Sequence, residues 1–133
     1  MGDTGDLIPR AKQALDGLAV PARPRDGDCL VWEPRVTALL VNAGMDAAGV
    51  VVIGWVDRPG RLLAYAHRTT LLARRVVVDC TARQFEQELP GLWVAELPAY
   101  CSVLAAATGV AEVTVTPTAA ARTSALPGRP AAG

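Results

Sequence analysis

Apolar positions recur with two different periods along the chain, and these periods divide it into helices and strands. Residues 7–18 and 29–43 carry apolar side chains at helical spacing, and Gly17 and Gly44 are suited to ending those helices. Pro34 would lie inside the second helix if that helix begins at Cys29, so its start stays open. Two helices are therefore expected in the first third of the chain.

The middle of the chain is rich in β-branched residues. Residues 49–56 are continuously apolar, which favours a central buried strand, and residues 57–60 read as a turn. Residues 61–71 and 75–79 are two further strand candidates. The short connection between them, near residue 73, predicts an antiparallel hairpin.

Two more elements follow toward the C-terminus. Residues 98–108 predict a helix, and the alternation over 111–116 predicts an edge strand before Pro117. Helices and mainly antiparallel strands thus segregate along the chain, which favours an α+β fold with the N-terminal helices packed on one mainly antiparallel sheet. We expect one domain over residues 1–117 and a disordered C-terminal tail over 118–133, where Ala, Pro, Thr, Arg and Gly dominate.

Composition restricts the partners. The 133 residues are 51% hydrophobic and 20% charged, as in a globular domain. Thirteen basic and thirteen acidic residues balance, which gives no electrostatic reason to expect nucleic acid or an anionic membrane as partner. No apolar run reaches the ~20 residues of a membrane span, and the acidic start does not resemble a secretory signal. With three cysteines and no Cys-x-x-Cys pair, free thiols and a cytoplasmic location are expected.

Cys29 and His67 are the first candidates for chemistry. Cys29 stands where a loop becomes a helix, and a helix N-terminus favours the thiolate and offers backbone N–H groups to an oxyanion. His67 is the single histidine of the chain, so any histidine-assisted mechanism must use it. A small core cysteine and a satisfied strand histidine are the structural alternatives.

Asp79 is the third candidate, because it ends a strand of three valines, where a carboxylate needs a partner. A hairpin turn centred near Ala73 would place His67 and Asp79 opposite each other on one face, whereas a slip of one residue would face His67 toward Cys80. Capping a turn through Thr81 is the other use of this aspartate. Together the three residues supply a nucleophile, a base and an orienting carboxylate.

The order of these residues resembles the papain-like and transglutaminase-like cysteine enzymes, with a helix-borne Cys29, then His67 and Asp79 on successive strands. The stretch from Asp79 to Phe85, Asp-Cys-Thr-Ala-Arg-Gln-Phe, is similar to an Asp-x-Thr-x-x-Gln-Phe segment of some bacterial members. The resemblance covers roughly residues 25–116. It implies Cys29 as nucleophile, His67 as general base and Asp79 as its orienter, and it implies no cofactor.

Three further residues are candidates for substrate binding. Gln84 and Arg83 follow Asp79 closely and are suited to donating hydrogen bonds to a carbonyl or carboxylate, although a solvated helix start explains them equally well. Trp32 lies one turn beyond Cys29; a core position is the more common use of such a tryptophan.

A zinc site must also be considered, because Cys29, His67, Cys80 and Cys101 would supply three thiolates and one imidazole. Their spacing lacks the close pairs that such sites show. We therefore expect no metal.

The sequence thus predicts a cysteine-dependent enzyme that attacks an amide or thioester through a thioacyl intermediate, with a peptide, amide or carrier-bound acyl substrate. Hydrolysis of peptidase, amidase or deamidase type is the first choice. An acyltransferase or cyclase of a biosynthetic pathway and an inactive papain-like binding module are the alternatives.

Overall fold

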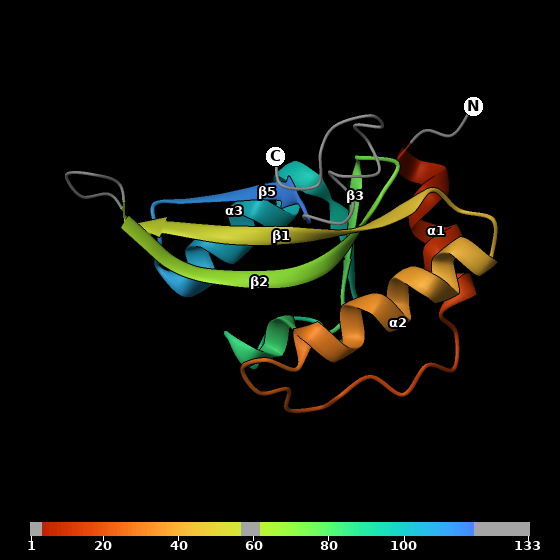
Figure 1. Ribbon diagram of the computed structural model, residues 1–133, viewed down its shortest axis with the longest axis horizontal. Coiled ribbons are helices and arrows are strands. Elements are labelled where there is room, and N and C mark those ends of the chain that lie inside the picture. The colour runs from red at the N-terminus through yellow and green to blue at the C-terminus, as the bar shows by residue number, and fades with distance from the viewer. Residues whose placement is uncertain (1–3, 57–61, 119–133) are drawn as a thin grey trace, which may run out of the picture.

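The computed structural model describes residues 4–56 and 62–118 (Figure 1). Their elements are, in chain order, α1 (Thr4–Ala14), α2 (Cys29–Asn42), β1 (Ala47–Val56), β2 (Leu62–Leu72), β3 (Val76–Asp79), the 3-10 helix η1 (Ala82–Gln84), β4 (Trp93–Glu96), α3 (Leu97–Thr108) and β5 (Glu112–Pro117). The predicted turn at 57–60 lies outside the described residues, and so does the predicted tail at 118–133 except for Thr118, which is buried. Within them, no helix has the length and apolar character that a bilayer span requires.

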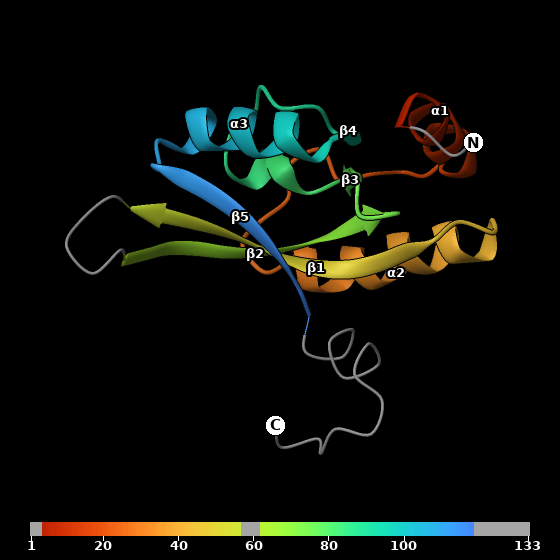
Figure 2. The same cartoon turned by 90° about the horizontal axis from the view of Figure 1, so that it is seen from above.

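The predicted α+β fold is confirmed: three α-helices pack on one antiparallel sheet of five strands in the order β4-β3-β2-β1-β5. Figure 2 shows α2 and α3 on opposite sides of β1 and β2. β5 lies at one edge, as its alternating sequence predicts. β4, at the other edge, was not predicted, because four residues after Pro90 and Gly91 are too few to establish a period.

The sheet separates two hydrophobic cores, and β3 contributes to both. Val76 and Val78 pack with the apolar faces of α1 and α2. Val77 points the other way and packs with Tyr100 and Leu104 of α3. All four residues of β3 are consequently buried. The strand that ends at Asp79 is therefore covered on both faces.

β1 differs from the prediction of a continuously buried strand. It lies between β2 and β5, but burial alternates along it, with Val50, Val52 and Gly54 buried and their neighbours partly exposed. The reason is that helices do not cover both faces of the sheet along its whole length. α1 also departs from the prediction: it begins at Thr4 and ends at Ala14, so that Pro9 lies inside it.

The register of the β2–β3 hairpin corrects the predicted pairing. Val76 pairs with Leu72 and Val78 with Thr70, so Asp79 does not stand opposite His67. The turn is centred at Arg74, one residue later than expected, and Ala73 and Arg74 both adopt positive φ there, at 48° and 60°. Since the register shift equals two residues, His67 and Asp79 remain on the same face and meet diagonally.

Candidate active site

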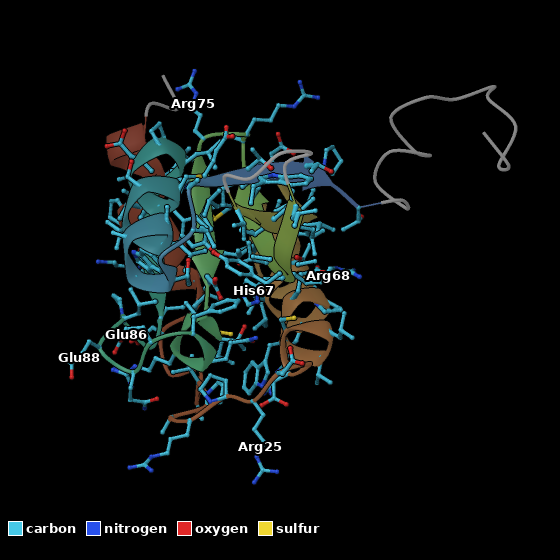
Figure 3. The ribbon with its side chains drawn as sticks, turned by 90° about the vertical axis from the view of Figure 1, so that its left-hand side faces the viewer. Arg25, His67, Arg68, Arg75, Glu86 and Glu88 are labelled. Atoms are coloured by element: carbon cyan, nitrogen blue, oxygen red, sulfur yellow. The ribbon has the colours of Figure 1, made fainter. Side chains whose placement is uncertain are left out.

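Three elements bring Cys29, His67 and Asp79 together. Cys29 is the first residue of α2, His67 lies on β2 and Asp79 is the last residue of β3. β2 continues past the end of β3, and His67 stands just beyond that end. Nε2 of His67 and Oδ2 of Asp79 are 2.9 Å apart, and both residues are 1% exposed. Figure 3 shows His67 inside the molecule, between α2 and η1.

Asp79 accepts hydrogen bonds from other groups besides the imidazole of His67. The hydroxyl of Tyr100, on α3, donates to the same Oδ2 at 2.7 Å. Oδ1 accepts the backbone N–H of Thr81 at 2.9 Å, and the Thr81 hydroxyl is 3.4 Å away. Asp79 thus makes the turn contact with Thr81 and the contact with His67 at once. A carboxylate with this many donors has a fixed orientation.

The pair of His67 and Asp79 is charged. Burial alone would raise the pKa of Asp79, but the charge and hydrogen bond of His67, with the donors Tyr100 and Thr81, lower that pKa below its ordinary value. Burial alone would lower the pKa of His67, but Asp79 and Cys29 raise it to about 9. At neutral pH the structure therefore favours an imidazolium against a carboxylate.

Cys29 completes the electrostatic group. Since Nε2 of His67 is occupied by Asp79, Nδ1 is the ring nitrogen left for the thiol; within the described residues it makes no hydrogen bond of standard geometry. Burial raises the pKa of Cys29, but the interaction with His67 and the backbone N–H of Arg68 outweigh it and lower the pKa below its ordinary value. The arrangement therefore favours a thiolate and an imidazolium over two neutral groups.

The first turn of α2 leaves one amide unused. The N–H groups of Leu30, Val31 and Trp32 donate to the carbonyl oxygens of Gly27 and Asp28, at 3.0–3.1 Å. Within the described chain, the Cys29 N–H makes no such bond. The expectation that several amides of this turn face an oxyanion is therefore reduced to the amide of Cys29 itself.

The predicted substrate-binding residues Gln84, Arg83 and Trp32 make their recorded contacts elsewhere in the structure. Arg83 donates from Nε to the carbonyl oxygen of Leu89 at 2.7 Å. Trp32 packs against the core of α1 and α2 and lies under the guanidinium of Arg35. Gln84 has a buried side-chain oxygen without a hydrogen-bond partner among the described residues. In the same part of the chain, no hydrogen bond or ring contact joins these three to Cys29, His67 or Asp79.

The other two cysteines lie in different environments. Burial, followed by the charge of Asp79, raises the pKa of Cys80 to about 12. Burial also raises the pKa of Cys101. Residues 4–56 and 62–118 contain no group of three or more His, Cys, Asp or Glu side chains arranged to hold a metal ion.

Sequence reasoning missed three groups of contacts. Tyr100 reaches Asp79 from a helix that gives no sign of it in the sequence. Phe85 packs edge-on against the His67 ring at 5.0 Å between centroids, and only its place in the Asp79 segment pointed to it. Glu33 and Arg68 form a partly buried ion pair on the helix of Cys29 and the strand of His67. The sequence did contain a signal for this pair, because Glu33 follows Cys29 by four residues on one helix face and Arg68 follows His67 directly.

Comparison with known proteins supports the fold. No protein-family model and no curated protein matches the chain. Among solved structures, the fold is similar to that of a chain from crystal structures that reveal a thiol-protease-like catalytic triad in the C-terminal region of Pasteurella multocida toxin. The TM-score is 0.63, with 18% identity over 86% of this chain. The match spans 17% of the toxin chain, so it concerns one part of a much larger protein.

Proposed function

We propose that this domain is a cysteine-dependent acyl-transfer enzyme that acts on an amide or thioester through a thioacyl intermediate. The observation that carries the proposal is the pair at 2.9 Å between Nε2 of His67 and Oδ2 of Asp79, with Cys29 at the helix N-terminus as the electrostatic neighbour of the same imidazole. The similarity to a toxin region with a thiol-protease-like triad supports the same class of chemistry.

In the proposed reaction, the Cys29 thiolate attacks the carbonyl carbon and a C–S bond forms while the carbonyl oxygen becomes an oxyanion. The C–N or C–S bond to the leaving group then breaks, and the imidazolium of His67 gives that group its proton. Water or an amine next attacks the thioacyl carbon and loses a proton to neutral His67. The C–S bond breaks, and the thiolate and imidazolium are restored. Asp79 holds the ring and stays ionised throughout.

Two groups are proposed to stabilise the oxyanion. The first is the N–H of Cys29, which belongs to the same residue as the nucleophilic sulfur and makes no backbone hydrogen bond among the described residues. Gln84 is the second candidate, because its buried side-chain oxygen has no partner among the described residues and such an atom marks a place where a ligand atom is expected. A half-turn of the side-chain amide would present its N–H donors at the same place. Arg83 is bound to the carbonyl oxygen of Leu89 and is less suited to this role.

Hydrolysis of peptidase, amidase or deamidase type is the first form of the proposal, because water is always present as an acceptor. Transfer to an amine and cyclisation use the same intermediate and differ only in the acceptor.

Alkylation by iodoacetamide tests the proposal without knowledge of the substrate. At pH 6 we expect Cys29 to react well ahead of Cys80 and Cys101, because its pKa is lowered whereas theirs are raised. Peptide mass spectrometry of timed samples gives the rate at each cysteine. In His67→Ala, the Cys29 rate at pH 6 should fall by at least about tenfold, since one pKa unit is a factor of ten in thiolate below the midpoint.

Cys101→Ser is the matched control, because it removes a cysteine outside the site and should leave the Cys29 rate unchanged. Equal, slow alkylation of all three cysteines in the folded protein would contradict the enzyme proposal and favour a binding module.

A further inference from the structure

A partly buried ion pair links the helix that carries Cys29 to the strand that carries His67. Oε1 of Glu33, on α2, accepts hydrogen bonds from Nη2 and Nε of Arg68, on β2, at 2.8 and 3.2 Å. The Glu33 side chain is 5% exposed and that of Arg68 is 34% exposed. Figure 3 shows Arg68 beside α2, while His67 lies deeper between α2 and η1.

The surroundings of Glu33 are built around its carboxylate. Thr37 donates to Oε2 at 2.8 Å, and because its single proton is used there, Thr70 is the donor in the 2.7 Å contact between the two threonines. On the other side the carboxylate lies against the backbone of β1. A Cβ atom at Gly49 would come within 2.6 Å of Glu33 Cδ, so β1 has no side chain at this point.

Both residues of the pair are tied to the proposed reacting groups. Glu33 lies one helical turn after Cys29, on the same face of α2. Arg68 follows His67 directly, and its backbone N–H is one of the groups that stabilise the Cys29 thiolate. Arg68 therefore contacts α2 twice, through its main chain at Cys29 and through its guanidinium at Glu33. Any sliding of α2 along β2 would change the separation of Cys29 and His67.

Stability alone does not account for such a pair. Glu33 is buried but the Arg68 side chain is 34% exposed, so the desolvation of the carboxylate and the solvent screening of the guanidinium both offset their attraction. The field of Glu33 also has the wrong sign for activation, since a carboxylate near Cys29 disfavours the thiolate. What the pair can supply is a fixed distance between two elements.

We propose that Glu33 and Arg68 are positioning residues that hold the nucleophile of α2 against the base of β2. The proposal rests on the proposed function of Cys29 and His67 and adds two residues whose side chains act through the position of α2 on β2. The charged groups that face Cys29 are His67 of β2 and Asp79 of β3, and neither is altered by a change at Glu33.

The test is the pH profile of Cys29 alkylation by iodoacetamide in Glu33→Gln, Arg68→Lys and the wild-type protein. Glu33→Gln keeps the shape and removes the charge, and Arg68→Lys keeps the charge and the backbone N–H but loses the two-nitrogen contact. If the pair positions Cys29, the midpoint should move to higher pH in both variants, by about one unit, which is about tenfold slower alkylation at pH 6. Arg10→Gln, which breaks the exposed pair with Asp6, is the control and should not move the profile.

Each of the other outcomes would contradict either the positioning role of the pair or the proposed function of Cys29. A shift to lower pH in Glu33→Gln would mean that Glu33 acts through its field. An unmoved midpoint with a lower melting temperature would mean that the pair is structural only. A wild-type Cys29 that titrates like Cys101 would overturn the proposed function itself, whatever the variants do. If Glu33→Gln does not fold at 25 °C, the unmoved or shifted profile of Arg68→Lys decides.

Discussion

The hydroxyl of Tyr100 donates to Oδ2 of Asp79 at 2.7 Å, and both residues are shielded from solvent. The bond joins α3 to the end of β3, so it fixes the carboxylate from the side of the sheet opposite α2. Tyr100 therefore belongs to the structure of the proposed site although it does not touch the thiol.

Tyr100→Phe removes one oxygen atom, and we expect it to lower the free energy of unfolding at pH 7 by about 1.5–3 kcal/mol, the range for hydrogen bonds to charged groups. The pKa of Asp79 is lowered in the folded state, so this stabilisation is present above its unfolded pKa and is lost as the pH falls through the folded pKa. Urea unfolding at several pH values should thus show a deficit that narrows toward acid pH.

Tyr65→Phe is the matched control for that experiment. Its hydroxyl contacts the hydroxyl of Thr108 at 2.9 Å, so a neutral bond is lost, at about 0.5–1.5 kcal/mol and without this pH dependence. Equal and pH-independent deficits in the two variants would mean that Tyr100 does not stabilise an ionised Asp79.

His67 should titrate near pH 9 in the untagged protein and well below that in Asp79→Asn. Burial lowers the pKa of His67 and the charge of Asp79 opposes it, so removal of that charge leaves burial dominant. The chain has one histidine, so its imidazole resonances in an NMR titration need no further assignment. Asp16→Asn, at an exposed position, is the control. A wild-type midpoint near 6.5 would show that the ion pair is absent.

In Cys29→Ser, the pH dependence of the free energy of unfolding should report on His67 without the opposing effect of Cys29. The pKa of His67 stays raised by Asp79, so the unfolded chain releases this proton near pH 6.5 while the folded chain keeps it longer. The contribution is full below about pH 6.5 and is lost as the pH rises through the raised pKa of His67. In the wild-type protein Cys29, with its lowered pKa, acts in the opposite direction, so thermal melts should show a shallower fall. Identical slopes for the two proteins would contradict the coupling of Cys29 and His67.

Gly49→Ala should destabilise the protein by about 1–3 kcal/mol, as overpacking does in a filled site. The new methyl group would meet the Glu33 carboxyl group at 2.6–2.7 Å, and that group is held by Arg68 and Thr37. Gly91→Ala is the control, because its nearest neighbour lies at an ordinary 3.5 Å and its φ is open to other residues. If both variants melt at the wild-type temperature, the carboxylate of Glu33 is free to move.

The elements that bear the site were predictable, because each depends on a local pattern. α2 begins at Cys29, one of the two starts that Pro34 left open, and His67 and Asp79 share a face because side chains alternate along any strand. The register that joins them was not predictable. It depends on Ala73 and Arg74 at positive φ, where the sequence carries no glycine or asparagine to signal the place of the turn.

The contacts around the site depend on which elements pack on which face of the sheet, and a single sequence does not record that. Tyr100 meets Asp79 only because α3 covers the face to which the end of β3 points. Glu33 meets Arg68 only because α2 covers the other face. Both are long-range relationships, whereas periodicity reports on neighbours in the chain.

The end of β3 at Asp79 divides β2 into two parts with different strand partners. From Thr70 to Leu72 the strand is flanked by β3 and β1, whereas from Leu62 to Thr69 it has β1 alone as a strand partner among the described residues. His67 therefore belongs to the singly paired part and is anchored by its side chain. In native-state hydrogen exchange, backbone amides of this part that point away from β1 should lose their protons by local opening, long before the interior of the sheet does.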